Sequence, residues 1–210
     1  MKIFKFFFLI LLFTFSGKAI ANTSFVWTER HPVLYEFISN NSNYFSRNKD
    51  NLFERYLEHK PYLIKKAKEI GVPTSLIYLP AVESGYRSDA ISYSGATGMW
   101  QFMLPTSKDV GLIVNDNIDE RKDWKKSTEA ALKYLKWMAD NFFWGDYELA
   151  ILAYNAGLGR VSRAIEKYNT RDPWFLITKT SDFNKEQREY LPRYLTFVSL
   201  FSNMEKEIQK

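Results

Sequence analysis

Glu83 lies in a setting that favours proton transfer. It ends an apolar helical run that holds Ile77, Leu79, Ala81 and Val82, and a loop rich in glycine and serine follows it. An apolar environment disfavours the charged form of a carboxyl group, and the negative C-terminal end of a helix adds to that effect. We therefore expect a raised pKa at Glu83 and a role as a general acid or base.

Two further stretches carry groups that bind polar ligands. Residues 98–103 hold the amide of Gln101 among large apolar side chains, and residues 153–157 hold Tyr154 beside Asn155. Large apolar residues are usually buried, so Met99, Trp100 and Phe102 favour the core over a sugar-binding face. Gln101 and Tyr154 fit either a ligand contact or a structural hydrogen bond to the backbone, whereas Asn155 favours holding a turn.

These residues must be positioned by helices, because helical periodicity dominates and no strand-like alternation competes with it. Thr74 to Ser84 predicts a helix kinked by Pro80, and Ser127 or Thr128 predicts the N-cap of the strongest helix. Further helices are expected near residues 52–70 (interrupted by Pro61), 106–110, 147–156, 160–168 and 185–207, while 25–51 suggests one short helix and then a loop. The predicted fold class is mainly α.

The N-terminus predicts export. Lys2 and Lys5 precede an apolar run over residues 6–15, and Ala19-Ile20-Ala21 fits a signal-peptidase site. We expect cleavage after Ala21 and a periplasmic product, with an uncleaved anchor as the alternative. A lipoprotein is excluded because the chain has no cysteine to carry the lipid.

Composition excludes several other classes. The net charge of +5 falls to +2 when Lys2, Lys5 and Lys18 are removed with residues 1–21, so nucleic-acid binding is not indicated. No Cys and two isolated histidines, His31 and His59, give no transition-metal ligand set. We expect no metal and no cofactor.

Four motifs in order then point to a family. They are Glu83-Ser84-Gly85-Tyr86, the segment from Gly95 to Met103, Ala153-Tyr154-Asn155-Ala156-Gly157, and Glu186-Gln187-Arg188-Glu189-Tyr190-Leu191-Pro192. Together they resemble the lytic transglycosylases of the soluble-type (SLT) catalytic domain family, and within it most of all the membrane-bound D type. The similarity extends back to residues 27–32 and covers most of the mature chain.

The resemblance implies a goose-type lysozyme-like domain that cleaves peptidoglycan glycan strands. Such enzymes cut the β-1,4 bond between N-acetylmuramic acid and N-acetylglucosamine without water and leave a 1,6-anhydro end. Glu83 matches the single catalytic acid/base. Matches to the saccharide cleft or its supporting turns are Ser92, Gln101, Met103, Tyr154, Asn155 and Glu186. The chain departs from the family at Gln187, where the usual residue is Thr.

Two alternatives stay open at this point. Retaining and inverting glycosidases need a second carboxylate near the first, so an aspartate close to Glu83 would favour a hydrolytic muramidase. The candidates, which otherwise fit loop and cap positions, are Asp89, Asp116, Asp119 and Asp123. A non-catalytic glycan-binding module is the second alternative, although the intact Glu83 and Gln101 disfavour it.

The expected organisation is a signal peptide over 1–21, an N-terminal helical extension over 22–72 and the catalytic domain over 73–210. The expected partners are peptidoglycan strands and a cell-envelope protein, since the sequence holds no recognisable wall-binding repeat. The chain is expected to be a monomer. General wall turnover and local wall opening for a secretion or conjugation apparatus both fit.

Overall fold

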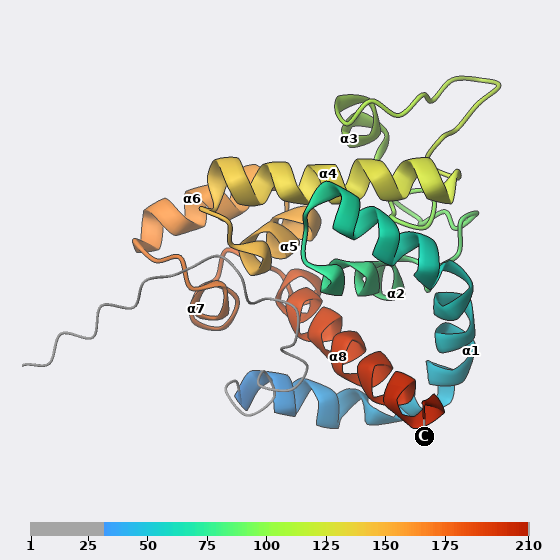
Figure 1. The fold of residues 1–210 in the computed structure, drawn as a ribbon. Helices are drawn as coiled ribbons and strands as arrows, with labels where there is room; N and C mark the ends of the chain where they lie inside the picture. Colours follow the sequence, from blue (N-terminus) through green and yellow to red (C-terminus); the bar gives the residue numbers. More distant parts are fainter. Residues whose placement is uncertain (1–31, 210) are drawn as a thin grey trace, which may run out of the picture.

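The computed structural model of the chain describes residues 32–209, which fold into a helical assembly (Figure 1). The predicted signal peptide lies outside these residues. The elements are α1 (Pro32–Ile70), the 3-10 helix η1 (Thr74–Tyr78), α2 (Leu79–Glu83), α3 (Leu104–Asp109), α4 (Trp124–Phe142), α5 (Tyr147–Ala156), α6 (Leu158–Tyr168), α7 (Pro173–Lys179) and α8 (Lys185–Ile208). No strand occurs between residues 32 and 209, which confirms the prediction of a mainly α fold.

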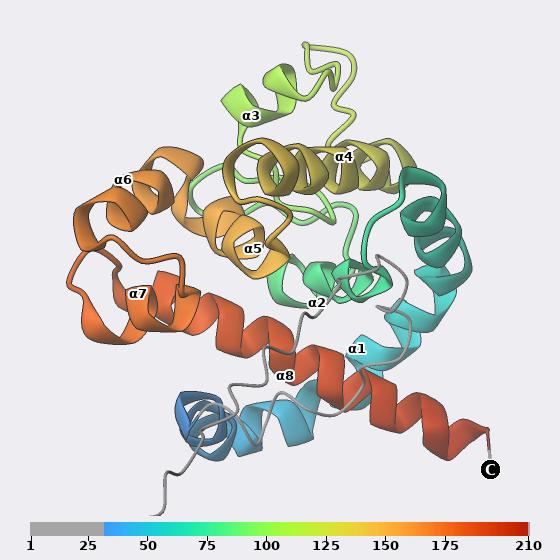
Figure 2. The ribbon, with the colours of Figure 1, turned by 60° about the vertical axis from the view of Figure 1, so that its left-hand side comes forward.

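Helix α5 occupies the centre of the fold. Its residues 149–153 are all buried, and α4, α6, α7 and α8 pack against it (Figures 1 and 2). Ala150 and Ala153 present small side chains that allow neighbouring helices to approach closely. Because α5 ends in Tyr154, Asn155 and Ala156, this central position fixes two predicted site residues relative to the whole core.

The N-terminal part of the described chain differs from the prediction. A single helix, α1, covers residues 32–70 in place of a short helix, a loop and a second helix, and Pro61 lies inside it. The missing backbone donor of Pro61 costs one hydrogen bond but does not end the helix, although α1 changes direction along its length (Figure 1). Tyr56, Leu63 and Ala67 are completely buried and hold α1 against the rest of the fold.

An aromatic cluster joins α1, α8 and the segment that follows α2. The Tyr56 ring of α1 lies 5.1 Å from the Phe201 ring of α8 and 5.6 Å from the Tyr86 ring, which follows α2. The Tyr86 hydroxyl donates to the Ile77 carbonyl at 3.0 Å. The high aromatic content of the chain therefore builds the core that fixes the end of α2.

Helix α4 begins earlier than predicted. Its N-cap is Asp123, whose carboxylate accepts from the backbone amides of Lys125 and Lys126, so the prediction of Ser127 or Thr128 was wrong. Both residues are instead buried inside the first turns. The Thr128 hydroxyl accepts from the Trp100 indole at 2.8 Å, which ties α4 to the loop after α2.

Helix α8 begins with a capping box that explains Gln187. The Asn184 side chain accepts from the Gln187 amide at 2.9 Å, and the Gln187 side chain accepts from the Asn184 amide at 3.0 Å. Thus Gln187, the departure from the family pattern, satisfies an exposed donor at the helix start. It thereby fixes the turn that carries Glu186 and leads to Tyr190.

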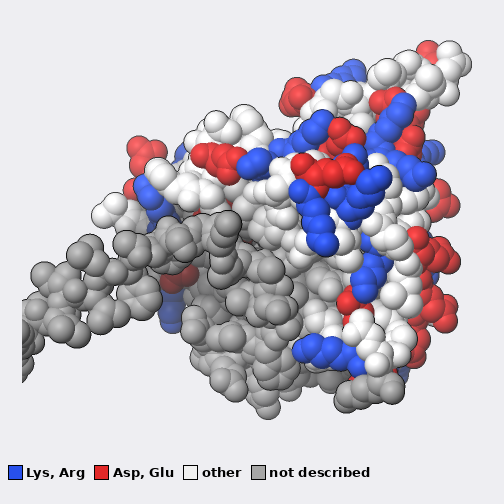
Figure 3. Space-filling model, viewed as in Figure 1, with Lys and Arg blue, Asp and Glu red and all other residues white. Residues whose placement is uncertain are grey.

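The face seen in Figure 3 carries both signs of charge. Basic and acidic side chains lie side by side over α1 and α4, where Lys66 pairs with Glu69 and Glu129, and Lys133 pairs with Glu129. This face therefore has no broad basic surface of the kind that binds nucleic acid. None of the helices in residues 32–209 is long and apolar enough to cross a bilayer.

Candidate active site

Glu83 is the last residue of α2, as the sequence predicts. The helix is shorter than expected, because η1 precedes it and Pro80 lies in its first turn, where a missing amide donor costs nothing. The prediction of a proline kink was therefore wrong. Ser84 ends the helix, and its buried hydroxyl donates to the Met99 carbonyl at 2.8 Å. This bond ties the end of α2 to the segment that carries Gln101.

The Glu83 carboxylate has a specific partner. It is half-buried, and its Oε1 accepts a hydrogen bond from the hydroxyl of Tyr190 in α8. Burial raises the pKa of Glu83, the Tyr190 hydrogen bond and Arg193 lower it, and the charge of Glu186 raises it; the net result is a pKa of about 7. A carboxyl group with such a pKa can donate a proton and take one back near neutral pH.

Tyr154 lies close to Glu83 and lines a hollow with other predicted residues. Burial raises the Tyr154 pKa first, and the Glu83 charge second. The Tyr154 hollow, about 250 Å³, is also lined by Gln101, Met103 and Asn155. Tyr134 borders both this hollow and a larger one of about 560 Å³ between α4 and α6, so the two adjoin. Four of the predicted site residues therefore line one hollow, and one of them, Tyr154, is close enough to Glu83 to be affected by its charge.

The hydrogen bonds of the predicted polar residues are largely structural. The Gln101 amide nitrogen donates to the carbonyls of Gly98 at 2.8 Å and Ala90 at 3.2 Å, and the Tyr154 hydroxyl donates to that of Trp100 at 2.8 Å. The Gln101 side-chain oxygen makes no hydrogen bond within the described residues, and Gln101 lines the hollow. Asn155 is different, because its Oδ1 is buried with no hydrogen-bond partner in the described residues.

The other predicted residues separate into two groups. Met103 is 43% exposed and lines the Tyr154 hollow, and the exposed Glu186 acts on the Glu83 charge. The Ser92 hydroxyl, in contrast, accepts from the Ala96 amide at 3.0 Å within its own turn and borders none of the hollows described. Met99, Trp100 and Phe102 are at most 2% exposed, which confirms their place in the core.

Two residues that contact or influence Glu83 carried no role in the sequence prediction. Tyr190 belongs to the fourth motif, and its hydroxyl donates to Glu83. The sequence did not distinguish it from the other aromatic residues of an amphipathic helix. Arg193 lies one turn further along α8 and also pairs with Glu189 at 3.4 Å. Tyr190 and Arg193 follow Glu186 by four and seven residues, which places all three side chains on one face of the helix. This spacing is the sequence feature that could have identified them.

Two of the aspartates considered as a second catalytic carboxylate make structural interactions instead. Asp119 pairs with Arg121 at 2.7 Å, and Asp123 caps α4. Among the described carboxylates, the one whose charge raises the Glu83 pKa is Glu186. Residues 32–209 also hold no cluster of His, Asp or Glu placed to bind a metal ion.

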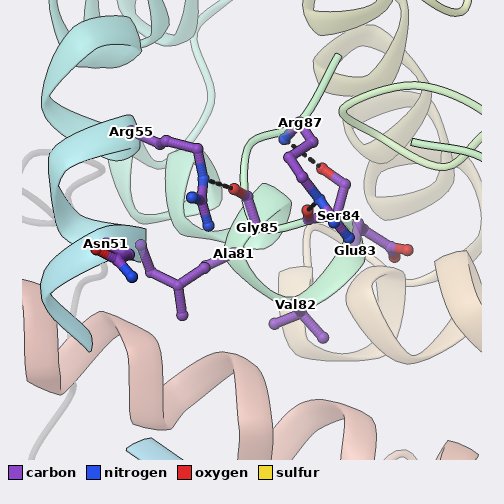
Figure 4. A pocket seen from close by; sticks show the side chains of 9 residues that line it. Asn51, Arg55, Ala81, Val82, Glu83, Ser84, Gly85 and Arg87 are labelled. Atoms are coloured by element: carbon purple, nitrogen blue, oxygen red, sulfur yellow. Dashed lines mark hydrogen bonds between the residues drawn. The ribbon is translucent and has the colours of Figure 1, made fainter. Parts of the chain in front are cut away.

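A third hollow, of about 320 Å³, is lined by Glu83 itself and by residues of α1 and the loop after α2 (Figure 4). Arg55 reaches it from α1, and Arg87 reaches it from the loop after α2. We call it the arginine hollow. No sequence motif predicted it, because α1 and the loop meet only in the folded chain.

The chain is similar to known proteins over the part that carries these residues. The sequence model described as the transglycosylase SLT domain matches residues 61–177. The membrane-bound lytic murein transglycosylase D of Escherichia coli K12 is 32% identical over 170 residues, which cover 77% of this chain and 36% of that protein. The peptidoglycan transglycosylase gp16 of Escherichia phage T7 is 34% identical over 134 residues, which cover 62% of this chain and 10% of the phage protein.

A solved structure shares the fold. The lytic transglycosylase Slt of Pseudomonas aeruginosa, in an inactive mutant with glutamate replaced by glutamine, matches with a TM-score of 0.57 at 28% identity. The match covers 70% of this chain and 24% of that one, so the chain spans about a quarter of this protein and about a third of the Escherichia coli relative. The predicted lysozyme-like fold is confirmed. Because the family model matches more than half of the 210 residues, the chain belongs to the transglycosylase SLT domain family.

Proposed function

We propose that this chain is a lytic transglycosylase that cuts the MurNAc-β-1,4-GlcNAc bond of peptidoglycan, with Glu83 as its single acid/base. The observation that carries the proposal is a half-buried carboxyl group, with a pKa of about 7, beside the Tyr154 hollow. Family membership and the relatives named as murein or peptidoglycan transglycosylases support the substrate class. The inactive glutamate mutant of the related Slt protein supports an essential glutamate.

Glu83 would act twice in one cycle. Protonated Glu83 gives its proton to the oxygen between the two sugars as that bond breaks. The acetamido oxygen of the muramic acid stabilises the anomeric carbon, and its own 6-hydroxyl then attacks that carbon while Glu83 takes the hydroxyl proton. The product is a 1,6-anhydro end, and Glu83 returns to its starting form without a water molecule.

The Tyr154 hollow would hold the sugar next to the broken bond. The Gln101 side-chain oxygen would accept a hydrogen bond from a hydroxyl or amide group of the sugar, and Met103 would supply an apolar wall. Asn155 also lines the hollow, but its side-chain oxygen is buried, so it shapes the turn and does not bind the sugar in this proposal. The adjoining hollow between α4 and α6 would extend the cleft for further sugars. In this proposal Ser92 does not contact the sugar, because its hydroxyl accepts from the Ala96 amide and stabilises its own turn.

The test is the Glu83→Gln variant, for which we expect an unchanged fold and a loss of glycan cleavage by at least about a thousandfold. Glu148→Gln is a matched control, because Glu148 is another poorly exposed carboxyl group with a pKa raised by burial to about 7. It packs against Trp174, away from the proposed chemistry, and should retain activity. A fully active Glu83→Gln protein would refute the proposal.

Product mass separates the transglycosylase from a muramidase. An anhydro product weighs one water less than a hydrolysed one, so mass spectrometry of digested peptidoglycan decides between them. The carboxylate that would serve a hydrolase is Glu186, since it influences Glu83 electrostatically. Reducing ends that disappear in Glu186→Gln would favour the muramidase, whereas saturable binding without any turnover would favour a glycan-binding module.

The same proposal includes a periplasmic location after removal of residues 1–21, because that is where peptidoglycan lies. We also propose that the chain is a monomer and that a cell-envelope protein is its partner. Fractionation of cells and N-terminal sequencing of the exported chain test the location, with an N-terminus at Asn22 expected.

A further inference from the structure

The arginine hollow has the charge and shape of an anion site. Arg55 and Arg87 both line it, together with the exposed amide of Asn51. Its volume of about 320 Å³ is at the lower end of the roughly 300–1,000 Å³ of ligand pockets. The rest of its lining consists of Leu52 and residues 81–85, so the two arginines are its basic groups.

Both guanidinium groups are fixed in place. The Arg55 Nε donates to the Gly85 carbonyl at 2.6 Å, and the Arg87 Nε donates to the Ser84 carbonyl at 2.9 Å. Figure 4 shows the two side chains on either side of Gly85. Because each bond uses Nε, the terminal nitrogens of both groups are left to bind a ligand, with little loss of side-chain freedom.

Neither arginine has an acidic partner among the described residues. The ion pairs of residues 32–209 include Arg121 and Arg193 but not Arg55 or Arg87. Glu83 is the one acidic side chain in the lining, and its carboxyl group is largely neutral below about pH 7. Two guanidinium groups therefore face a hollow without a counter-charge, which favours a carboxylate or phosphate ligand.

We propose that the arginine hollow binds a carboxylate of the peptide stem carried by the muramic acid of the glycan strand. This rests on the proposed function, because the stem that holds these carboxylates is joined to the lactyl group of the muramic acid whose glycosidic bond Glu83 would help to break. Glu83 lines the arginine hollow, and its charge also acts on Tyr154, so the stem would bind next to the residue that would act on the sugar. The hollow would make the enzyme prefer strands that carry acidic stems.

The experiment compares three forms of one glycan strand: with tripeptide stems, with the stem carboxylates amidated, and with the stems removed by an amidase, which leaves the lactyl carboxylate on the sugar. We expect the wild-type chain to have a KM about tenfold lower for the acidic stems than for the amidated ones. Arg87→Gln and Arg55→Gln should each reduce this ratio to near one. Arg163→Gln, an exposed arginine of α6, is the matched control and should keep it.

Arg87 is the safer of the two variants, because it is exposed, whereas Arg55 also holds the Gly85 carbonyl. Equal KM values for acidic and amidated strands in the wild type, or a ratio kept by Arg87→Gln, would overturn the proposal. Loss of cleavage on all three strands in the wild type would instead refute the proposed function. In that case the affinities of the uncut acidic and amidated strands, measured by calorimetry, still test the arginine hollow, and equal affinities would overturn the proposal.

Discussion

At Glu83, burial and a hydrogen bond act in opposite directions on one carboxyl group. Burial raises the pKa, and the donated bond from Tyr190 lowers it by stabilising the carboxylate. The result is a pKa of about 7, which suits a group that must give a proton in one step and take one in the next. Glu186 and Arg193 adjust the same pKa from the helix that carries Tyr190.

Two variants of α8 should move the pH dependence of cleavage in opposite directions. The first step needs protonated Glu83, so kcat/KM should fall as the pH rises through the Glu83 pKa. Tyr190→Phe removes a bond to the carboxylate, raises the Glu83 pKa and should move this alkaline limb to higher pH. Glu186→Gln removes a neighbouring negative charge, lowers the Glu83 pKa and should move the limb to lower pH.

The measurement is kcat/KM against pH from about 4 to 9 for each variant. Tyr62→Phe is the control, since its hydroxyl contacts the Lys125 carbonyl on a distant face and should leave the midpoint unchanged. A common midpoint in all four proteins would show that Glu83 does not control the alkaline limb.

The loop between α2 and α3 depends on one close approach of backbone to backbone. Gly98 has a φ of +86°, and a Cβ placed there would lie 1.7 Å from the Arg121 carbonyl oxygen. The Arg121 guanidinium also donates to the carbonyls of Gly95 and Phe102, so this contact organises the segment that carries Gln101. The glycine is therefore required by space as well as by backbone angle.

Gly98→Ala should be severely destabilising, because neither backbone segment can move without breaking these bonds. Gly95→Ala is a matched control with a φ of +83° and nothing within 4 Å of the added Cβ. It should cost only the backbone strain, about 1 kcal/mol. Thermal unfolding and soluble yield test the pair, and equal losses in the two variants would contradict the role of the Arg121 contact.

At the scale of the elements, the sequence predicted most helices but misjudged where some of them begin. The apolar spacing of α5, and of α8 despite Pro192, survives in the structure. The early part of α1 has the composition of a loop, because Asn and Ser compete locally with helix formation. Asp123 was missed as a cap since Ser127 and Thr128 offered the same chemistry.

The site was predictable where chemistry lies within one segment and not where two segments meet. Glu83 and Tyr154 belong to local motifs, so the sequence indicated both. The hydroxyl that contacts Glu83 comes from 107 residues away, and Arg55 contacts Gly85 across 30 residues. Such pairings depend on tertiary packing, which a single sequence does not display.

At the scale of the whole molecule, α1 and the remaining helices share one core. Tyr56 packs against Phe201, and Leu63 and Ala67 are completely buried. A helical extension over 22–72 and a catalytic domain over 73–210 stay a prediction. The shared aromatic cluster indicates that the part of that extension within α1 stabilises the catalytic helices.

Two carboxyl groups with raised pKa values should make the folded state less stable as the pH rises. Burial raises the pKa of Glu148, like that of Glu83, from an ordinary value of 4.5 to about 7. Between these pH values the folded chain holds protons that the unfolded chain releases, so the free energy of unfolding falls as the pH rises through this window. The stabilising neutral form contributes fully below pH 4.5, and its contribution is lost above a pH of about 7.

Glu148→Gln should therefore raise the melting temperature at pH 8 by a few °C and leave it nearly unchanged at pH 4. The amide oxygen of the introduced glutamine can still accept from the Trp174 indole, which donates to the Glu148 carboxylate at 3.0 Å. The Oε1 atom of Glu148, buried without a partner among the described residues, explains why a charge is costly there. Melting curves of the two proteins at both pH values test this, and an equal difference at pH 4 and pH 8 would show that the charge of Glu148 is not the cause.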